Sequence, residues 1–322
     1  MTFNTQTTLA GFAEHGYVLR QRETLALASL LNQRQGVRAL LIEGEPGAGK
    51  TSLGEYLAKV LDVEDQLVMY MFHNWTGDDE VFKGFDAVAA FAGDKDNVFL
   101  PGVFTRVLEL SRKATPEKPV ICILDELDKA PERVENLLLD VLQSGRVPTK
   151  PGCSEKIELD NVIFFLTSNA HRPLNEALLR RVRRLYMNRL PAKAVNKLVT
   201  GWVSNDYKEM SAGHVRGLVT LANKVASQVA HKEGTFHSPQ ELRRLTEELI
   251  NLRALNLITD IREMELVVAA WAAKNPALQG KKDIAAGAGL NNLWGALKQF
   301  VKPGMLTAAD TSATSAEDAS SD

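Results

Sequence analysis

Cysteine is scarce in this sequence, and long apolar runs are missing. Only two of the 322 residues are cysteines, Cys122 and Cys153, so a disulfide framework is not expected. The longest uninterrupted apolar stretch covers residues 266–273, whereas a membrane-spanning helix needs about 20 apolar residues. Residues 1–10 have neither the basic start nor the apolar core of an export signal. These absences predict a cytoplasmic protein without a membrane-spanning segment.

An excess of charge of either sign is also absent. The 38 Lys and Arg residues nearly balance the 40 Asp and Glu residues, giving a formal net charge of −2. Such a charge exerts no general attraction on nucleic acid or on an anionic membrane. Aromatic residues make up 7% of the chain and are not interleaved with basic ones in a visible stripe. The composition therefore disfavours a nucleic-acid partner, and a chain of this length is expected to form two subdomains.

A glycine-rich loop, G-E-P-G-A-G-K-T, occupies residues 44–51, between an apolar run with strand character and an amphipathic helical segment. Glycines let the backbone come close to a phosphate, Lys50 would reach the β- and γ-phosphates, and Thr51 would ligate Mg²⁺. This pattern arises by chance in roughly one chain of this length per hundred, so an ordinary glycine turn is disfavoured. We predict a nucleoside triphosphate site whose contacts are Gly44, Glu45, Pro46, Gly47, Ala48, Gly49, Lys50, Thr51 and Ser52.

Two adjacent carboxylates follow a second apolar strand, at residues 119–126. Asp125 is placed to hold the Mg²⁺, and Glu126 to orient and deprotonate an attacking water. Taken alone, an Asp-Glu pair fits a solvated strand end equally well. Following a phosphate loop at this distance, the pair predicts hydrolysis of the nucleotide.

A third apolar strand, residues 161–168, ends at Asn169. If this strand is inserted between the other two, Asn169 would lie beside the triphosphate; a helix cap or turn residue is the alternative. Residues 173–184 follow, and we expect them to form one short helical stretch that carries four arginines. In a monomer such a cluster is a solvated face, whereas in a ring-forming ATPase one arginine would enter the neighbouring site.

Together these motifs resemble those of AAA+ ATPases, and the segments between them are similar to the MoxR-like branch. Residues 76–84, 99–106 and 124–130 resemble that branch's D-x-x-G, F-x-P-G-P-x and L-x-D-E-x-x-R-A signatures. Residues 131–143 are similar to its helix P-x-x-Q-x-x-L-L-x-x-M-x-E. The similarity is strong from about residue 36 to 190 and weaker to about 275. It implies an ATPase that uses ATP and Mg²⁺, forms a homo-oligomeric ring, expected to be a hexamer, and remodels a client protein. A von Willebrand factor A domain on another chain is the expected partner.

The resemblance also implies roles for single residues. Asn169 matches the family's first sensor and Arg181 its arginine finger, while Arg180 stands where the family often has an acid. The roles of the two arginines therefore remain open. The second sensor is commonly the arginine of S-P-R; here Gln240 stands at that position, and Arg243 is the substitute one turn further on. Tyr17 and Val18 match the segment that lines the adenine pocket, although ordinary packing of an entry loop fits them equally well.

The expected fold class is α/β, with a parallel P-loop AAA+ sheet covered by helices on both faces and followed by a small all-helical lid. Helices are predicted after the sheet at about 192–204, 211–231, 239–256 and 260–273. The predicted regions are a nucleotide-binding domain at 1–190 with a hairpin insert at about 82–100 that turns at 93–97, a helical lid at 191–275, a linker with a short amphipathic helix at 276–302, and a disordered acidic tail at 303–322.

Two other functions compete with protein remodelling. Residues 169–181 have some likeness to the N-T-A-D-R-S…A-L-R-R-R-F segment of the McrB group, which would make the chain an NTPase motor or a DNA-associated AAA+ ATPase. A nucleotide-gated scaffold without activity is disfavoured because Glu126 is intact. The amphipathic helix at 290–301 is expected to dock on its own ring or on a neighbour, with recruitment of another protein as the alternative.

Overall fold

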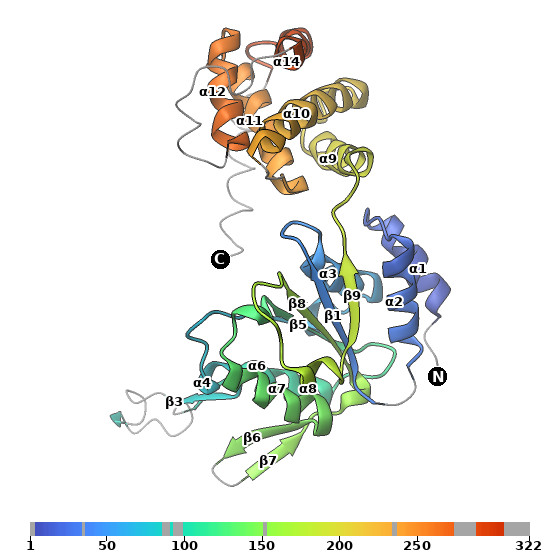
Figure 1. Ribbon diagram of the computed structural model, residues 1–322. Coiled ribbons are helices and arrows are strands. Elements are labelled where there is room, and N and C mark those ends of the chain that lie inside the picture. Colours follow the sequence, from blue (N-terminus) through green and yellow to red (C-terminus); the bar gives the residue numbers. More distant parts are fainter. Residues whose placement is uncertain are drawn as a thin grey trace. The chain divides into compact units, whose positions relative to one another are not determined.

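The computed structural model describes residues 4–33, 36–85, 91–92, 99–150, 153–233, 237–273 and 288–305. The chain divides into two compact units, Met1–Arg189 and Leu190–Asp322 (Figure 1). Within the described ranges, no helix is long and apolar enough to cross a membrane. The turn expected at 93–97, residues 276–287 of the expected linker and the tail after residue 305 lie outside these ranges.

A five-stranded parallel sheet forms the centre of the first unit, in the order β2-β5-β8-β1-β9. Its strands are β1 (Arg38–Gly44), β2 (Leu67–Met71), β5 (Val120–Asp125), β8 (Val162–Ser168) and β9 (Arg183–Met187). Strand β8 lies between β5 and β1, as the sequence-based placement of Asn169 required. The carboxyl ends of these three strands therefore lie together, where ligands bind in open α/β sheets.

Helices cover both faces of this sheet (Figure 1). Along β1, Leu40 and Ile42 enter the core on one face, and Ala39 and Leu41 enter the core on the other. This alternation explains why the strand reads as a continuous apolar run. The first core is closed by α1 (Thr5–Glu14), α2 (Gln21–Leu31) and α3 (Lys50–Leu61), and the second by α4 (Asp78–Val81), α6 (Val103–Ser111), α7 (Glu132–Ser144) and α8 (Glu176–Leu179). The expected α/β fold is confirmed.

Two small antiparallel ribbons extend the first unit. Strand β3 (Lys83–Phe85) pairs with β4 (Phe99–Pro101), and β6 (Arg146–Lys150) pairs with β7 (Cys153–Lys156). All four residues of β7 are exposed, and in β6 Val147 is buried in the core of the first unit, so β7 shows no alternation of apolar and polar residues. The described part of the unit also contains short 3₁₀ turns, η1 (Glu64–Gln66), η2 (Leu127–Lys129) and η3 (Leu159–Asn161).

The arginine-rich segment differs from its prediction. A single helical stretch was expected over residues 173–184, but α8 covers only Glu176–Leu179, and Arg180 is its C-cap. Arg183 and Arg184 already belong to β9, which pairs with β1 and buries Leu185. The helix prediction is wrong because sheet pairing with β1 overrides a local pattern too short to form a stable helix.

The second unit is a bundle of helices around its own core. Its helices are α9 (Ala192–Asp206), α10 (Ala212–Glu233), α11 (Pro239–Ala254), α12 (Ile261–Ala272) and α14 (Ala288–Phe300). Helix α11 begins with a capping box, in which the Ser238 hydroxyl accepts the Glu241 N–H at 3.2 Å. Helix α14 packs in this core through the buried side chains of Leu290, Leu293 and Leu297, and Val301, directly after the helix, is buried in the same core. The amphipathic helix therefore docks within its own unit.

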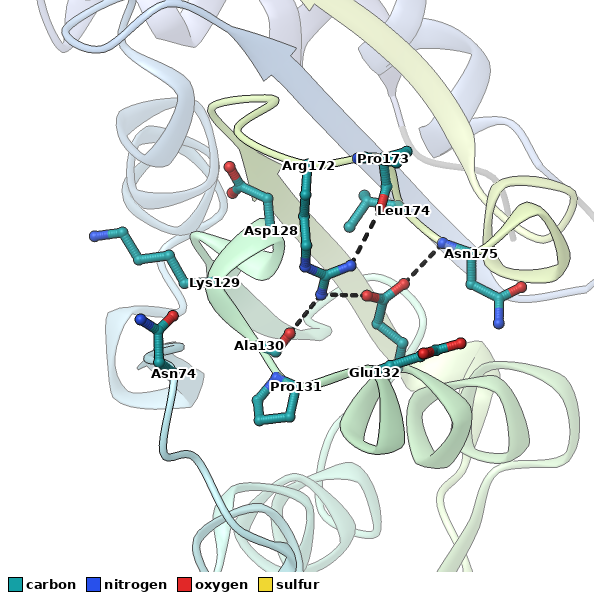
Figure 2. A pocket seen from close by; sticks show the side chains of 11 residues that line it. Asn74, Asp128, Lys129, Ala130, Pro131, Glu132, Arg172, Pro173, Leu174 and Asn175 are labelled. Carbon is teal, nitrogen blue, oxygen red and sulfur yellow. Dashed lines mark hydrogen bonds and ion pairs between the residues drawn. The ribbon is translucent and has the colours of Figure 1, made fainter.

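A cleft of about 580 Å³ opens on the first unit beside the residues that follow β5 and β8 (Figure 2). One wall is formed by η2 and the start of α7, and the other by the segment that connects β8 with α8. Asp128, Glu135 and Arg172 are among its lining residues. Most residues that line the cleft therefore follow closely, in the chain, either the Asp125–Glu126 pair or Asn169.

Candidate nucleotide-binding site

The glycine-rich loop joins β1 to α3 in a conformation that needs its glycines. Gly47 and Gly49 have φ angles of 75° and 88°, in the region that favours glycine. At Gly44 a Cβ atom would lie 2.3 Å from the carbonyl oxygen of Met187, which no side chain tolerates. Helix α3 starts at Lys50, and its N-cap Gly49 supplies no side-chain hydrogen bond. The loop thus presents backbone N–H groups and a positive helix end, which suits an anion.

Lys50 turns back over this loop and joins it to the third strand. Its Nζ donates to the carbonyl oxygens of Gly44 at 2.9 Å and Glu45 at 3.0 Å, and to Asn169 Oδ1 at 2.6 Å. The residue is 7% exposed. Burial lowers the pKa of Lys50, and the nearby carboxylates of Asp125, Asp128 and Glu126 act against this decrease. A buried ammonium group beside a loop of N–H groups is suited to bind phosphate oxygens.

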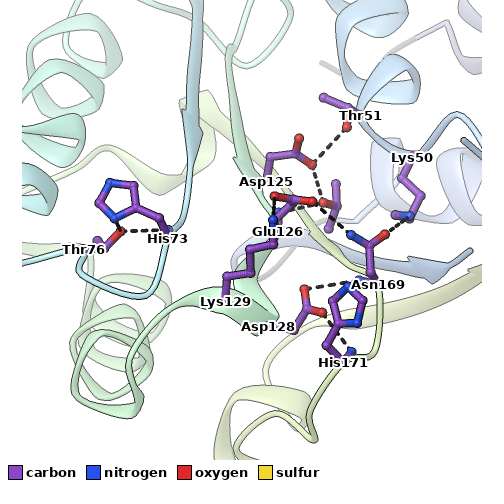
Figure 3. Close-up of polar contacts among 11 residues, drawn as sticks. Lys50, Thr51, His73, Thr76, Asp125, Glu126, Asp128, Lys129, Asn169 and His171 are labelled. Carbon is purple, nitrogen blue, oxygen red and sulfur yellow. Dashed lines mark hydrogen bonds and ion pairs between the residues drawn. The ribbon is translucent and has the colours of Figure 1, made fainter. Parts of the chain in front are cut away.

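Asp125 ends β5 and receives two hydroxyl hydrogen bonds at one oxygen (Figure 3). Thr51 Oγ1 donates to Asp125 Oδ1 at 2.9 Å, and Thr167 Oγ1 donates to the same atom. Among the described residues, no group of three or more His, Cys, Asp and Glu side chains could hold a metal by itself. A site with two protein oxygens, from Thr51 and Asp125, fits a Mg²⁺ ion that also takes phosphate oxygens and water.

Glu126 lies directly after Asp125, with its backbone in the left-handed region at a φ of 54°. Its N–H donates to Thr167 Oγ1 at 3.0 Å. Its Oε1 accepts from Asn169 Nδ2 at 3.1 Å, and its Oε2 lies 2.6 Å from Lys129 Nζ (Figure 3). Asn169 therefore bridges Lys50 and Glu126, one from each of the two predicted motifs.

The remaining residues of the predicted loop set lie around this centre. Glu45 forms an ion pair with Arg189 at 2.6 Å, and Ser52 lies in the first turn of α3. Tyr17 Oη donates to the Gly49 carbonyl oxygen at 3.4 Å, and burial raises the pKa of this tyrosine. Val18 is 42% exposed. The structure therefore brings Tyr17 to the phosphate loop and leaves Val18 open to solvent.

Arg180 and Arg181 lie at the end of α8, apart from this hydrogen-bonded set. Arg181 Nη1 donates to the Ala177 carbonyl oxygen at 2.6 Å, and its Nη2 donates to Gln143 Oε1 at 2.7 Å. Arg180 is exposed, and its Nη2 is 3.5 Å from Glu176 Oε2. Both arginines thus contact groups of their own unit, on α7 and α8.

Arg243 belongs to the second unit, on α11. Its Nη2 is 2.9 Å from Asp206 Oδ2, and its Nε is 2.6 Å from Glu247 Oε1. Burial acts to lower the pKa of Arg243, but its contacts with Glu247 and Asp206 outweigh burial and raise it. The guanidinium is therefore held by two carboxylates of its own unit.

Sequence analysis missed two residues that organise this site, Thr167 and Asp128. Thr167 is fully buried between Asp125 and Glu126, and Asp128 is 4% exposed. Asp128 accepts the N–H groups of Asn169 at 3.2 Å and His171 at 2.9 Å. A hydroxyl near the end of an apolar strand was the available signal for Thr167, and the second aspartate of D-E-L-D was the signal for Asp128.

Comparison with known proteins bears on the first unit. Residues 39–182 match the family model described as an AAA domain of the dynein-related subfamily. The chaperone protein ClpB of Aquifex aeolicus is 30% identical over 146 residues, which cover 45% of this chain and 13% of that protein. ClpB of Bacillus cereus is 28% identical over 163 residues, which cover 47% of this chain and 17% of that protein. A mitochondrial Lon protease homolog of Neurospora crassa is 25% identical over 254 residues, covering 76% of this chain and 21% of that protein.

The solved structures support the same fold. A closed-state reconstruction of Hsp104 with ATPγS and FITC casein superposes with a TM-score of 0.54 at 19% identity, covering 78% of this chain and 48% of that chain. The chain spans less than a quarter of the length of these curated relatives. The family match, the parallel sheet order and the phosphate loop agree with one another. Residues 39–182 are therefore similar in sequence to an AAA domain, and the sheet order of the first unit agrees with that similarity.

Proposed function

We propose that this chain is a Mg²⁺-dependent ATPase of the MoxR-like branch that assembles into a hexameric ring and remodels a client protein. The observation that carries the proposal is the bridge made by Asn169, which accepts from Lys50 and donates to Glu126. The bridge supports the proposal because it joins Lys50, as the cation that would bind phosphate, to Glu126, as the candidate general base, through one polar side chain. The similarity to ClpB, which is named as a chaperone, supports a protein client.

Each residue of the bridge has a separate task in this proposal. Lys50 would exchange its carbonyl acceptors for oxygens of the triphosphate, and the loop N–H groups would hold the same phosphates. Thr51 and Asp125 would hold the Mg²⁺, which supplies positive charge to the phosphate oxygens. Glu126 would accept the proton of the attacking water, while Asn169 keeps the carboxylate turned toward it.

The pairing of Glu126 with Lys129 bears on the resting state of this base. Lys129 Nζ lies 2.6 Å from Glu126 Oε2. The hydrogen bond to this carboxylate and the negative charge of Glu126 raise the pKa of Lys129. The other carboxylate oxygen accepts from Asn169, so both oxygens have a donor. The lysine side chain is 42% exposed, and its release would free one oxygen for water.

Two substitutions test the division of labour. Lys50→Ala should weaken binding of ATP, whereas Glu126→Gln should bind ATP and lose turnover by about 10²- to 10⁴-fold, the range expected for a general base. Lys59→Ala, which removes an exposed lysine from the same helix, is the matched control and should behave as the unmodified protein. Binding is measured by calorimetry and turnover by phosphate release. Normal turnover by the Glu126→Gln protein would refute the assigned base.

The Glu126→Gln protein held in ATP also tests the ring and the client. Its mass should correspond to six chains, and it should retain a partner with a von Willebrand factor A domain that the Lys50→Ala protein does not retain. The competing McrB-like function rests on the likeness of residues 169–181. DNA that stimulates hydrolysis, and that binds with a steep dependence on salt, would favour that function over protein remodelling.

A further inference from the structure

The segment that connects β8 with α8, residues 169–175, is held by two buried carboxylates. Asp128 is 4% exposed and Glu135 is fully buried. Asp128 lies on η2 and Glu135 on α7, so both follow Glu126 closely in the chain. Burying a carboxylate is costly unless hydrogen bonds and opposite charge compensate. The hydrogen bonds and the ion pair of Asp128 and Glu135 therefore have to offset the cost of burying two charges.

Asp128 holds the beginning of the segment by hydrogen bonds to its backbone. Its two oxygens accept the N–H groups of Asn169 and His171, at 3.2 Å and 2.9 Å. Between them Ala170 has a φ of 58°, a conformation that costs a residue other than glycine about 1 kcal/mol or more. Asp128 thus stabilises a strained turn directly after the side chain that bridges Lys50 and Glu126.

Glu135 holds the far end of the same segment. Its Oε2 accepts the Asn175 N–H at 2.8 Å, and its Oε1 forms an ion pair with Arg172 Nη2. Arg172 also donates to the carbonyl oxygens of Ala130 and Pro173. The side chain of Asn175 caps α8 by accepting the Ala177 N–H at 2.9 Å. Glu135 therefore fixes both the segment and the start of the helix that leads to Arg180 and Arg181.

We propose that Glu135 is a positioning residue for the nucleotide site, which acts by holding residues 172–175 on α7 and so fixing Asn169 between Lys50 and Glu126. This inference rests on the proposed ATPase function. Stability alone does not explain the residue, because a leucine would fill the same space without the cost of burying a charge. Misplacement of a catalytic side chain by about 1 Å can cost about a hundredfold in rate, so a remote anchor has a measurable effect.

Two variants of Glu135 separate its contacts. Glu135→Leu removes both the Asn175 hydrogen bond and the Arg172 ion pair, and should lower kcat about tenfold with KM for ATP changed less than about twofold. Glu135→Gln keeps an acceptor for the Asn175 N–H and should recover most of kcat. Glu132→Gln is the matched control, because Glu132 lies on the same helix and lines the same cleft but is exposed. It should leave kcat and KM unchanged.

A double-mutant cycle distinguishes positioning from a merely structural role. If Glu135 acts through Asn169, Glu135→Leu should cause no further loss of kcat in an Asn169→Ala background. Equal losses in both backgrounds would overturn the inference, as would a Glu135→Leu protein that loses only thermal stability.

Hydrogen exchange of the full chain provides a readout that does not need turnover. Glu135→Leu should speed exchange of the Asn169 and His171 amides about tenfold, in addition to that of Asn175. Unchanged exchange at Asn169 and His171 would overturn the inference even in a protein without ATPase activity. If Glu135→Leu does not fold, Glu135→Gln should still show a smaller increase at the same amides, and no increase would count against the proposal. Absence of turnover in the unmodified protein would refute the proposed function alone.

Discussion

Charged side chains are organised differently in the two units of this chain. In the first unit, Lys50, Asp125 and Glu126 gather at one end of the sheet and are joined through Asn169, Thr51 and Thr167. In the second unit, Arg243 is paired with Asp206 and Glu247 in a local cluster. Lys50 is 7% exposed, whereas the side chain of Arg243 is 39% exposed.

The two clusters differ in how much their charges cost in free energy of folding. Gathering buried charges at one place is unfavourable for folding unless they serve a ligand, so such a cluster indicates a functional site. A half-exposed ion pair on a helix costs little and contributes little, about 0–1 kcal/mol. Substitutions in the first cluster should therefore alter activity more than stability, and those in the second unit should do the reverse.

The largest effect is expected at Arg181, which in the proposed ring would add a charge to the corresponding cluster of a neighbouring subunit. Arg181→Ala should bind ATP normally but hydrolyse it about a thousandfold more slowly, the scale of a lost arginine finger. The proposed reason is that Arg181 leaves its contacts with Ala177 and Gln143 and stabilises the transition state of a neighbouring subunit. Steady-state phosphate release measures this loss.

Mixing experiments decide between the two arginines. Arg181→Ala chains mixed with Lys50→Ala chains should regain part of the activity, because an intact pocket then faces an intact arginine. If mixing restores nothing, either the site is not shared or Arg180 has this role. A similar loss and rescue for Arg180→Ala would assign the role to Arg180.

Much of this site could be predicted from the sequence because its parts are local. The loop G-E-P-G-A-G-K-T specifies its own backbone, and Asp125 and Glu126 follow directly from the end of an apolar strand. The place of Asn169 beside the other two motifs depended on the insertion of β8 between β5 and β1, which the sequence analysis assumed and the sheet order shows. Thr167 and Asp128 were missed because their roles depend on bonds between strands and turns about 40 residues apart, which no local pattern encodes.

In the second unit, substitutions should alter stability more than activity. Leu293→Ala removes a fully buried side chain of α14, and such cavities cost about 2–5 kcal/mol of unfolding free energy. Chemical denaturation followed by tryptophan fluorescence measures the loss, since Trp202, Trp271 and Trp294 pack against the core that contains Leu293. ATP binding by the first unit should not change. Asn292→Ala, on the exposed side of the same helix, is the control and should shift nothing beyond about 0.5 kcal/mol.

The outline of the fold was also predictable, but segments whose conformation depends on distant partners were not. The helices of the second unit have apolar faces and, at Ser238, a capping box that fixes a start. By contrast, β9 is defined by its pairing with β1, and its arginines resemble a helical face when viewed alone. The ribbon of β6 and β7 has an exposed strand, so hydrophobic periodicity gives no signal for it.

A smaller effect is expected from Thr167, which tests whether the first cluster depends on its neutral members. Thr167→Val keeps the shape but leaves the Glu126 N–H without its acceptor, at a cost of about 1–3 kcal/mol. It should lower kcat by about tenfold or more and raise the Mg²⁺ concentration needed for half-maximal rate, because Asp125 also loses a donor. Thr167→Ser retains the hydroxyl and should keep most of the activity. Equal losses in both variants would show that packing, not hydrogen bonding, matters here.

The smallest effect is expected at Arg243, the member of the second unit for which the sequence predicts a role at the nucleotide. If its contacts with Asp206 and Glu247 are its whole role, Arg243→Gln should cost about 1 kcal/mol or less and leave ATP turnover unchanged. If Arg243 is instead the second sensor, Arg243→Gln should lower turnover about tenfold, because a cation that reaches the nucleotide stabilises its negative charge. Arg244→Gln, at an exposed neighbour, is the control. A rescue is decisive: Gln240→Arg restores the family's arginine one turn earlier, so it should recover turnover in the Arg243→Gln protein. If Arg243→Gln lowers turnover and Gln240→Arg does not recover it, Arg243 acts by holding α11 in place and not by contacting nucleotide.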